Sequence, residues 1–395
     1  MTSATINIRD LTPEDFLDDV EKWLDGAMSR LRERFSDWQF PDLDCRRFWN
    51  EELCRANLVA LTWPREYGGR ALDTGTLIKF HEMCAVRGSP QPLNSIAHSI
   101  LAPTLLQFGT ANQKSRFLEG IRLGTAVWCQ GYSEPSAGSD LASIKTRAQR
   151  DGGRWIVNGH KIWTTQAHLA QWCFALVRTQ PEEKAHNGLS FMLINMNAPG
   201  VRVNPIRQIT GEANYNECFF ENVQVPAEDL VGNAGDGWRI AMAAAEYERG
   251  IYFLPRVIQL QTELDAINKL FKSRPPIEPH RTALAAKLIE LQDSCRVIRW
   301  RVDAILARVA AGKTPGTDGT VLKLLWSETR QAVMEIWMEL LGELAVVGPG
   351  AGKHYPEEAA AAREFLWSRA ETIVAGTSEV QRNIIAERIL GLPKG

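Results

Sequence analysis

The sequence predicts an α+β fold in which a helical region, a β region and a second helical region follow one another along 395 residues. Apolar residues recur at helical spacing up to about Leu123. Short β-branched and aromatic runs with turn residues between them then extend from about Ala126 to near Gly232. Long helical patterns return a few residues later. We therefore expect three domains, at residues 1–125, 126–232 and 233–395.

The first domain opens with clear signals for the start of a helix. Thr12 can cap the helix and Pro13 suits its first position, and two acidic residues follow in the first turn. Turns rich in Gly and Pro separate the later helical patterns. Four further helices are expected, at Phe48–Ala56, Thr74–Val86, Leu93–Gln107 and Gln113–Ile121. This domain is predicted to be all-α.

The second domain is predicted to be a small β sandwich or barrel, because several short strands follow at regular spacing. Within it, "RWIVNGHKIWTT" places Asn158-Gly159 between two β-prone runs, and Asn-Gly is a strong hairpin signal. We expect a hairpin there that carries Trp163 and Thr165. Beside it, Ser133–Asp140 is rich in small residues and hydroxyls, so its backbone can approach a ligand closely and offer donors to it.

The third domain is predicted to be a four-helix bundle. Proline-rich breaks such as "SRPPIEPHR" separate segments with apolar residues three and four apart. The expected helical segments are Trp238–Lys272, His280–Ala311, Thr320–Leu344 and Tyr355–Arg388.

Composition excludes several classes of protein. A net charge of −2 gives no reason to expect a nucleic-acid partner. The seven cysteines contain no Cys-x-x-Cys pair, which predicts reduced thiols and no metal site. No apolar run reaches transmembrane length, and the first residues lack the pattern of a signal peptide. We expect a cytoplasmic protein that does not bind membranes.

Six motifs in order along nearly the whole chain resemble the acyl-CoA dehydrogenase family. They are "WPREYGG", "FGTANQKSRFLEGI", "SEPSAGSD", "VNGHKIWTT", "FFENVQVP" and "AGTSEVQRNIIAERILG". The resemblance implies an α-helical domain, a β-barrel and a four-helix bundle. It also implies FAD as cofactor, an acyl-CoA thioester as substrate, a trans-2-enoyl-CoA as product in β-oxidation of a fatty acid or steroid, and an electron-transfer flavoprotein as electron acceptor.

The same resemblance assigns roles to residues of the motifs. The expected substrate-binding residues are Arg249, Ala375 and Ser139, which is expected to contact the cofactor as well. The expected cofactor-binding residues are Gln130, Ser133, Gly138, Ser139, Trp163, Thr164, Thr165, Gly376, Thr377 and Glu379.

The position of the catalytic base departs from the commonest family pattern. Most members carry a Glu directly before the C-terminal Gly-Thr, where this chain has Ala375. Members similar to isovaleryl-CoA and long-chain acyl-CoA dehydrogenases instead carry a Glu-Arg pair roughly three helical turns after a Gly-Trp. Glu248-Arg249 matches that pair, so Glu248 is the expected base. Glu246 would lie on another helix face. The alternative is that both glutamates are solvated helix acids.

The motifs that homotetrameric members lend to a neighbouring FAD site are also altered. "LFKSRPPIEPHR" lacks the usual Phe-Gly-x-Pro, and "MELLGELAVVG" has Glu339 and Glu343 where Gln and Gly are usual. This pattern resembles the heteromeric bacterial branch, in which a sister subunit completes the FAD site and bulky steroid-type CoA esters are common substrates. The alternative is a divergent homo-oligomer.

Two other functions remain open from the sequence. One is a flavin monooxygenase or an enzyme similar to nitroalkane oxidase, because neither needs a base at Ala375. The other is a catalytically silent partner subunit of a hetero-oligomeric dehydrogenase.

Overall fold

A computed structural model describes residues 12–35, 42–180, 186–248, 254–273, 279–311, 313, 317–348 and 356–393. The chain divides into two compact units. Unit 1 contains Met1–Arg207 and Ala213–Glu248, and unit 2 contains Gln208–Glu212 and Arg249–Gly395. Each unit is described here by itself.

The N-terminal part of unit 1 is helical, as predicted. Helix α1 (Pro13–Arg34) is capped by Thr12, whose hydroxyl accepts from Asp15 N at 3.2 Å, and its buried residues recur at helical spacing. The next helices are α2 (Leu43–Arg55), α3 (Thr74–Val86), the π-helix η2 (Ala97–Leu101), α4 (Ala102–Phe108) and α5 (Ala111–Leu123).

Two of these helices differ from the sequence prediction. Helix α2 begins earlier than Phe48 because the Asp42 side chain accepts from Cys45 N at 2.8 Å and caps it there. The segment Leu93–Gln107 was predicted as one helix, and it consists of η2 followed by α4. A π-helix cannot be read from apolar spacing alone.

Within the described residues, eight strands form one sheet in the order β6-β7-β3-β2-β4-β5-β8, and β1 pairs with β4 in parallel. The strands are β1 (Trp128–Gly131), β2 (Arg147–Asp151), β3 (Arg154–Thr165), β4 (Trp172–Arg178), β5 (Leu189–Asn195), β6 (Val201–Ile206), β7 (Tyr215–Pro226) and β8 (Leu230–Val231).

The expected turn at Asn158-Gly159 was wrong. Strand β3 continues through both residues, and the β2–β3 hairpin turns at Gly152-Gly153 instead. A Cβ at residue 159 would lie 2.2 Å from Thr146 Oγ1. Gly159 therefore serves close packing of β3 at a register shift against β7 and does not serve a turn.

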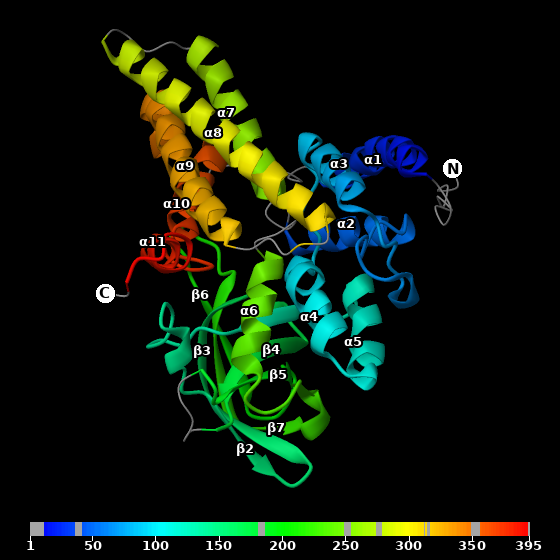
Figure 1. The fold of residues 1–395 in the computed structure, drawn as a ribbon. Coiled ribbons are helices and arrows are strands. Elements are labelled where there is room, and N and C mark those ends of the chain that lie inside the picture. Colours follow the sequence, from blue (N-terminus) through cyan, green and yellow to red (C-terminus); the bar gives the residue numbers. More distant parts are fainter. Residues whose placement is uncertain are drawn as a thin grey trace. The chain divides into compact units, whose positions relative to one another are not determined.

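Strands β4 and β5 are buried on both faces. Phe174, Leu176 and Phe191 pack with the N-terminal helices, and the alternate residues Cys173 and Ala175 pack with β3 and β7. Helix α6 (Gly237–Glu248) lies against β5, where a Cβ at Gly237 would come within 2.5 Å of the Ser190 backbone (Figure 1). The sheet thus fixes both the β1–β3 region and the start of α6.

Unit 2 contains α7 (Leu254–Ser273), α8 (His280–Ala310), α9 (Asp318–Leu341), the 3-10 helix η7 (Gly342–Val346), α10 (Pro356–Glu371), α11 (Ser378–Ile384) and the π-helix η9 (Ile385–Ile389). Helix α9 packs against α7, α8 and α10 (Figure 1). Its Arg330, 2% exposed, binds Glu263 of α7 at 2.7 Å and Glu371 of α10 at 2.6 Å. No described helix is both long and apolar enough to cross a membrane.

Two of the long predicted helical segments are interrupted. Tyr355–Arg388 is broken after α10 by a turn in which Ala375 and Gly376 have φ of 56° and 96°. Left-handed backbone cannot continue an α-helix. Trp238–Lys272 comprises α6 and α7, and residues 249–253 between them lie outside the described residues.

Candidate active site

The loop after β1 is tied to strand β3 and exposes its tip. Ile162 N of β3 donates to Ser133 O at 3.0 Å, and Glu134 and Ala137 exchange two backbone hydrogen bonds. Gly138 and Ser139 are exposed, and a Cβ at Gly138 would meet no atom within 4 Å. The loop tip therefore offers backbone and hydroxyl donors with open space in front of them. Gln130 lies just before it in β1.

Trp163 stands in an unusual conformation near the end of β3. Its φ is +60°, its side chain is 56% exposed, and it meets Tyr215 edge to face at 6.2 Å. The pairing of β3 with β7 shifts register between Lys161 and Thr164, and such irregularities re-aim side chains next to functional sites. A bulky residue with positive φ is strained, and strain of this kind concentrates at binding sites.

The neighbours of Trp163 take different environments. Thr165 pairs with Tyr215 of β7 and is partly exposed. Thr164 is 1% exposed, and its carbonyl accepts from Asn216 Nδ2 at 2.9 Å. Since Ile162 bonds to the Ser133 carbonyl, the structure places the polar loop directly beside the strand that carries Trp163 and Thr165.

Helix α6 ends at Glu248, the expected base. The side chains of Glu246 and Glu248 and all of Arg249 lie outside the described residues. The backbone of α6 places position 248 four residues after Ala244 and seven residues after Ala241, both of which are buried. Position 246 is four residues after Met242, which is partly buried.

In unit 2 the turn at Ala375-Gly376 is held by two buried side chains from α9 and α11. Lys323 Nζ donates to Gly376 O at 2.6 Å, and Gln381 Nε2 donates to Ala375 O at 2.9 Å. Thr377 then caps α11 by accepting from Val380 N at 3.2 Å. The backbone of this turn is therefore fixed although the positive φ of Ala375 is strained.

The residues after the turn supply polar groups for a ligand. Ser378 Oγ and Gln381 Oε1 are buried and have no hydrogen-bond partner among the described residues. Glu379 is exposed, and the backbone N–H of Glu379 and the Thr377 hydroxyl lower the pKa of its carboxyl. Buried polar atoms are normally satisfied, so Ser378 and Gln381 fit a polar group bound at this turn. In unit 1, the open loop tip at Gly138 and the exposed Trp163 ring fit a flavin cofactor.

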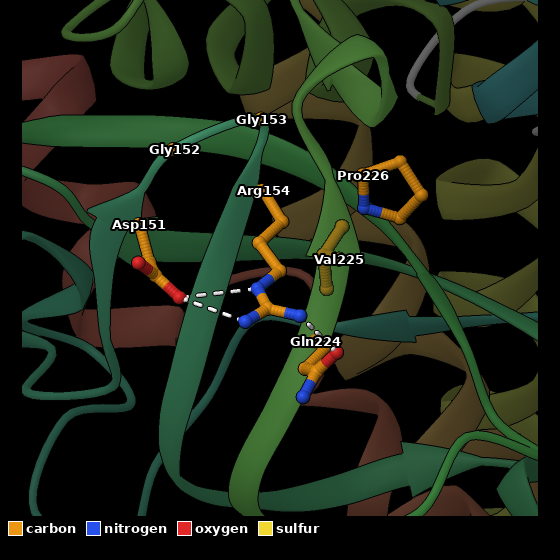
Figure 2. Close-up of a pocket in the computed structure, with 7 residues that line it drawn as sticks. All are labelled: Asp151, Gly152, Gly153, Arg154, Gln224, Val225 and Pro226. Atoms are coloured by element: carbon orange, nitrogen blue, oxygen red, sulfur yellow. Dashed lines mark hydrogen bonds and ion pairs between the residues drawn. The ribbon is translucent and has the colours of Figure 1, made fainter.

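A surface depression at the β2–β3 turn is separate from the candidate site residues. Figure 2 shows it between Asp151–Arg154 and the end of β7, with Arg154 bound to Asp151 at 3.1 Å and to Gln224 at 2.8 Å. Arg154 begins β3, so it lies about 30 Å along that extended strand from Trp163. Its guanidinium is engaged by its neighbours, and the depression plays no part in the candidate site.

Comparison with known proteins identifies the family. Models of the acyl-CoA dehydrogenase N-terminal, middle and C-terminal domains match residues 12–125, 129–223 and 235–390. Acyl-CoA dehydrogenase IpdE1 of Mycobacterium tuberculosis is 42% identical over 369 residues, which cover 93% of this chain and 91% of that protein. The chain belongs to the acyl-CoA dehydrogenase family. As an acyl-CoA dehydrogenase it is an oxidoreductase, and the family implies FAD.

Solved structures agree with the fold of this acyl-CoA dehydrogenase. The ChsE4-ChsE5 complex from Mycobacterium tuberculosis matches with a TM-score of 0.79 and 26% identity, covering 98% of this chain and 99% of that chain. A variant of the Tcur3481-Tcur3483 steroid ACAD matches with a TM-score of 0.79 and 25% identity, covering 94% and 100%. The predicted order of a helical, a β and a second helical region is thus confirmed.

The sequence analysis did not identify the buried residues that fix the C-terminal turn and the loop after β1. Lys323 and Gln381 fix the C-terminal turn, and Lys161 lies beneath the loop after β1. One signal was available for each lysine. Lys323 interrupts the apolar run "VLKLLW", and Lys161 follows Trp155 and Val157 at the two-residue period of the inward face of β3.

Proposed function

We propose that this acyl-CoA dehydrogenase removes the α-proton of an acyl-CoA thioester with Glu248 and forms a trans-2-enoyl-CoA. One observation carries the assignment of the base. Position 248 is in line with the buried residues Ala241 and Ala244 of α6, which precede it by two helical turns and by one. A glutamate on a buried helix face needs a specific reason, because charged residues are seldom placed there.

The chemistry makes demands that the chain's own residues can meet. A thioester α-proton is a very weak acid, so the base must be a positioned carboxylate, and the thioester oxygen needs hydrogen-bond donors. Ala375 cannot take a proton, but its backbone N–H, held in the strained turn, is proposed as one such donor. FAD, when bound, supplies the acceptor for the hydride that leaves the β-carbon.

The proposed cofactor contacts divide between the two units. In unit 1 they are Gln130, Ser133, Gly138, Ser139, Trp163, Thr164 and Thr165, and in unit 2 they are Gly376, Thr377 and Glu379. Ser139, Arg249 and Ala375 are proposed to contact substrate. Support comes from the open loop tip, the exposed Trp163 ring and the buried polar atoms that follow Gly376.

We also propose the domain boundaries 1–125, 126–232 and 233–395. The three matching family models support them, since the gaps between models fall at residues 126–128 and 224–234.

The proposed substrate is a bulky, steroid-type CoA ester, and the proposed assembly includes a sister subunit that completes the FAD site. Two observations support this. The Tcur3481-Tcur3483 protein is called a steroid ACAD, and ChsE4-ChsE5 is a complex of two named components. This chain has Glu339 at a position where the homotetrameric motif has Gln. Glu339 lies 2.9 Å from His280 Nε2 and so joins the end of α9 to the start of α8. An electron-transfer flavoprotein is the proposed electron acceptor.

The test is anaerobic reduction of the flavin. Straight-chain, branched, aromatic and steroid CoA esters are mixed with the purified chain, alone and with any protein that co-purifies with it. Bleaching of the oxidised flavin band, fastest with the steroid ester, is expected. Absence of bleaching with every ester, together with oxygen consumption on a nitroalkane, would show an oxidase or monooxygenase instead. A chain that holds no flavin even with its partner would be a silent subunit.

A further inference from the structure

A buried ion pair lies directly beneath the loop that follows β1. The Lys161 side chain is 0% exposed and that of Glu134 is 4% exposed, and Lys161 Nζ lies 2.8 Å from Glu134 Oε1. The same ammonium donates to Tyr132 O at 2.9 Å. A single lysine of β3 therefore binds both the backbone and a side chain at the start of this loop.

Glu134 extends the connection to the other end of the loop. Its carboxylate also accepts from Lys145 N at 2.6 Å and from Thr146 N at 2.8 Å, just before β2 begins. The two ends of the segment 132–146 thus meet at one carboxylate, which is itself fixed to β3. The exposed tip at Gly138 and Ser139 lies between those ends.

The charge states agree with this geometry. Burial alone would raise the pKa of Glu134, but the charge of Lys161 and the N–H donors outweigh it and lower that pKa, so Glu134 is ionised at neutral pH. Burial lowers the pKa of Lys161, while Glu134 opposes that effect. Lys161 and Glu134 therefore form a buried, charge-assisted hydrogen bond.

Stability alone is a weak reason for such a pair. Removing two charges from water is expensive, and apolar residues of similar volume often stabilise a protein as well or better. An apolar pair could not, however, bind Tyr132 O and the N–H groups of residues 145 and 146. What those bonds determine is the position of the loop relative to β3, whose Trp163 follows Lys161 by two residues.

We propose that Lys161 and Glu134 are positioning residues that set the loop 132–146 against β3 for cofactor binding. The inference rests on the proposed role of this loop in holding FAD. Neither side chain touches the cofactor. They act through the backbone that carries Gly138 and Ser139.

The experiment measures two quantities in the full-length chain with any co-purifying partner: the melting temperature of the deflavinated protein, and the Kd for FAD well below that temperature. The variants are Lys161→Met, Glu134→Gln and the double variant. Each single change is expected to lower the melting temperature, because it leaves one buried charge unpaired. The double variant, which has no buried charge, is expected to recover most of that loss. Its Kd for FAD is nevertheless expected to stay at least about tenfold above that of the unchanged protein, because the bonds to Tyr132 O and residues 145–146 are lost or weakened.

Two further variants complete the design. Glu134→Asp keeps both charges but shortens the side chain, so a folded protein with weaker FAD binding is expected. Lys22→Met makes the same change as Lys161→Met at a side chain that is 79% exposed, and should alter neither quantity. Double-variant and Glu134→Asp proteins that bind FAD as tightly as the unchanged chain would overturn the inference and leave the proposed function standing. An unchanged chain that binds no FAD would overturn both.

Discussion

The two positions at which this family's fold can carry a catalytic base differ sharply in this chain. Position 248 is a glutamate at the end of a regular helix, aligned with the buried residues of α6. Position 375 is an alanine in a left-handed turn, fixed by hydrogen bonds from Gln381 and, through Gly376, from Lys323. We therefore propose that Glu248 takes the proton and that the backbone of the turn at Ala375 donates hydrogen bonds to the substrate.

Replacing the proposed base should have the largest effect. Glu248→Gln is expected to lower turnover by about 10²- to 10⁴-fold, the range typical of a general base, while FAD stays bound. The measurements are steady-state kcat and the flavin absorbance of the purified variant. Glu246→Gln is the matched control, two residues away on the same helix, and should retain nearly full activity. Equal losses in both variants would remove the distinction between the two glutamates.

Returning a carboxylate to the other position would sharpen the comparison. Glu248→Gln combined with Ala375→Glu is expected to recover activity about tenfold over Glu248→Gln alone, yet to remain below the unchanged enzyme. The recovery is partial because the surroundings of position 375 accommodate an alanine and do not hold a carboxylate in one orientation. Single-turnover reduction of the flavin measures this. If Ala375→Glu gives no recovery, the turn and the end of α6 do not approach the same substrate proton.

Some features of the fold and of the candidate site could be predicted from the sequence, and others could not. Helix starts, such as the Thr12 cap, and the order of the three regions follow from local patterns, because capping and periodicity are local properties. Gly159 was misread, since a glycine for a turn and a glycine for close packing look alike until Thr146 is placed against it. Lys161 and Lys323 were missed for the same reason. Their partners lie 27 and 53 residues away, and only the fold brings them together.

The strained turn in unit 2 can be tested through Gly376. Gly376→Ala is expected to destabilise unit 2 by about 1–3 kcal/mol, because a side chain at φ 96° is disfavoured and its Cβ would lie 2.6 Å from Gln381 Nε2. FAD binding should weaken with it. Gly391→Ala is the control, since its φ is also positive, at 68°, but a Cβ there meets no atom within 4 Å. Chemical unfolding and FAD titration report the two effects. Equal losses at both glycines would mean that backbone strain alone, and not the contact with Gln381, makes the turn sensitive.

The last prediction changes the pH instead of a residue and distinguishes the two units by how their stability responds to acid. Burial lowers the pKa of His81 and of His98 in unit 1 to about 4, below the value of 6.5 for an unfolded histidine. The unfolded chain therefore binds protons that the folded unit resists, and unit 1 should lose stability as pH falls from 6.5 towards 4, by up to about 1.4 kcal/mol per pH unit for each histidine. In unit 2, burial raises the pKa of Glu263 and Glu371 despite their contacts with Arg330, so acid stabilises unit 2 by protonating these buried carboxylates.

Hydrogen-exchange protection, corrected for intrinsic rates, should thus fall in α4 and stay unchanged in α9 between pH 7 and pH 5. His98→Phe keeps a ring beside Trp63 and should halve the histidine contribution to that slope in unit 1. A slope that His98→Phe leaves unchanged would place the acid sensitivity of unit 1 elsewhere than in this buried ring.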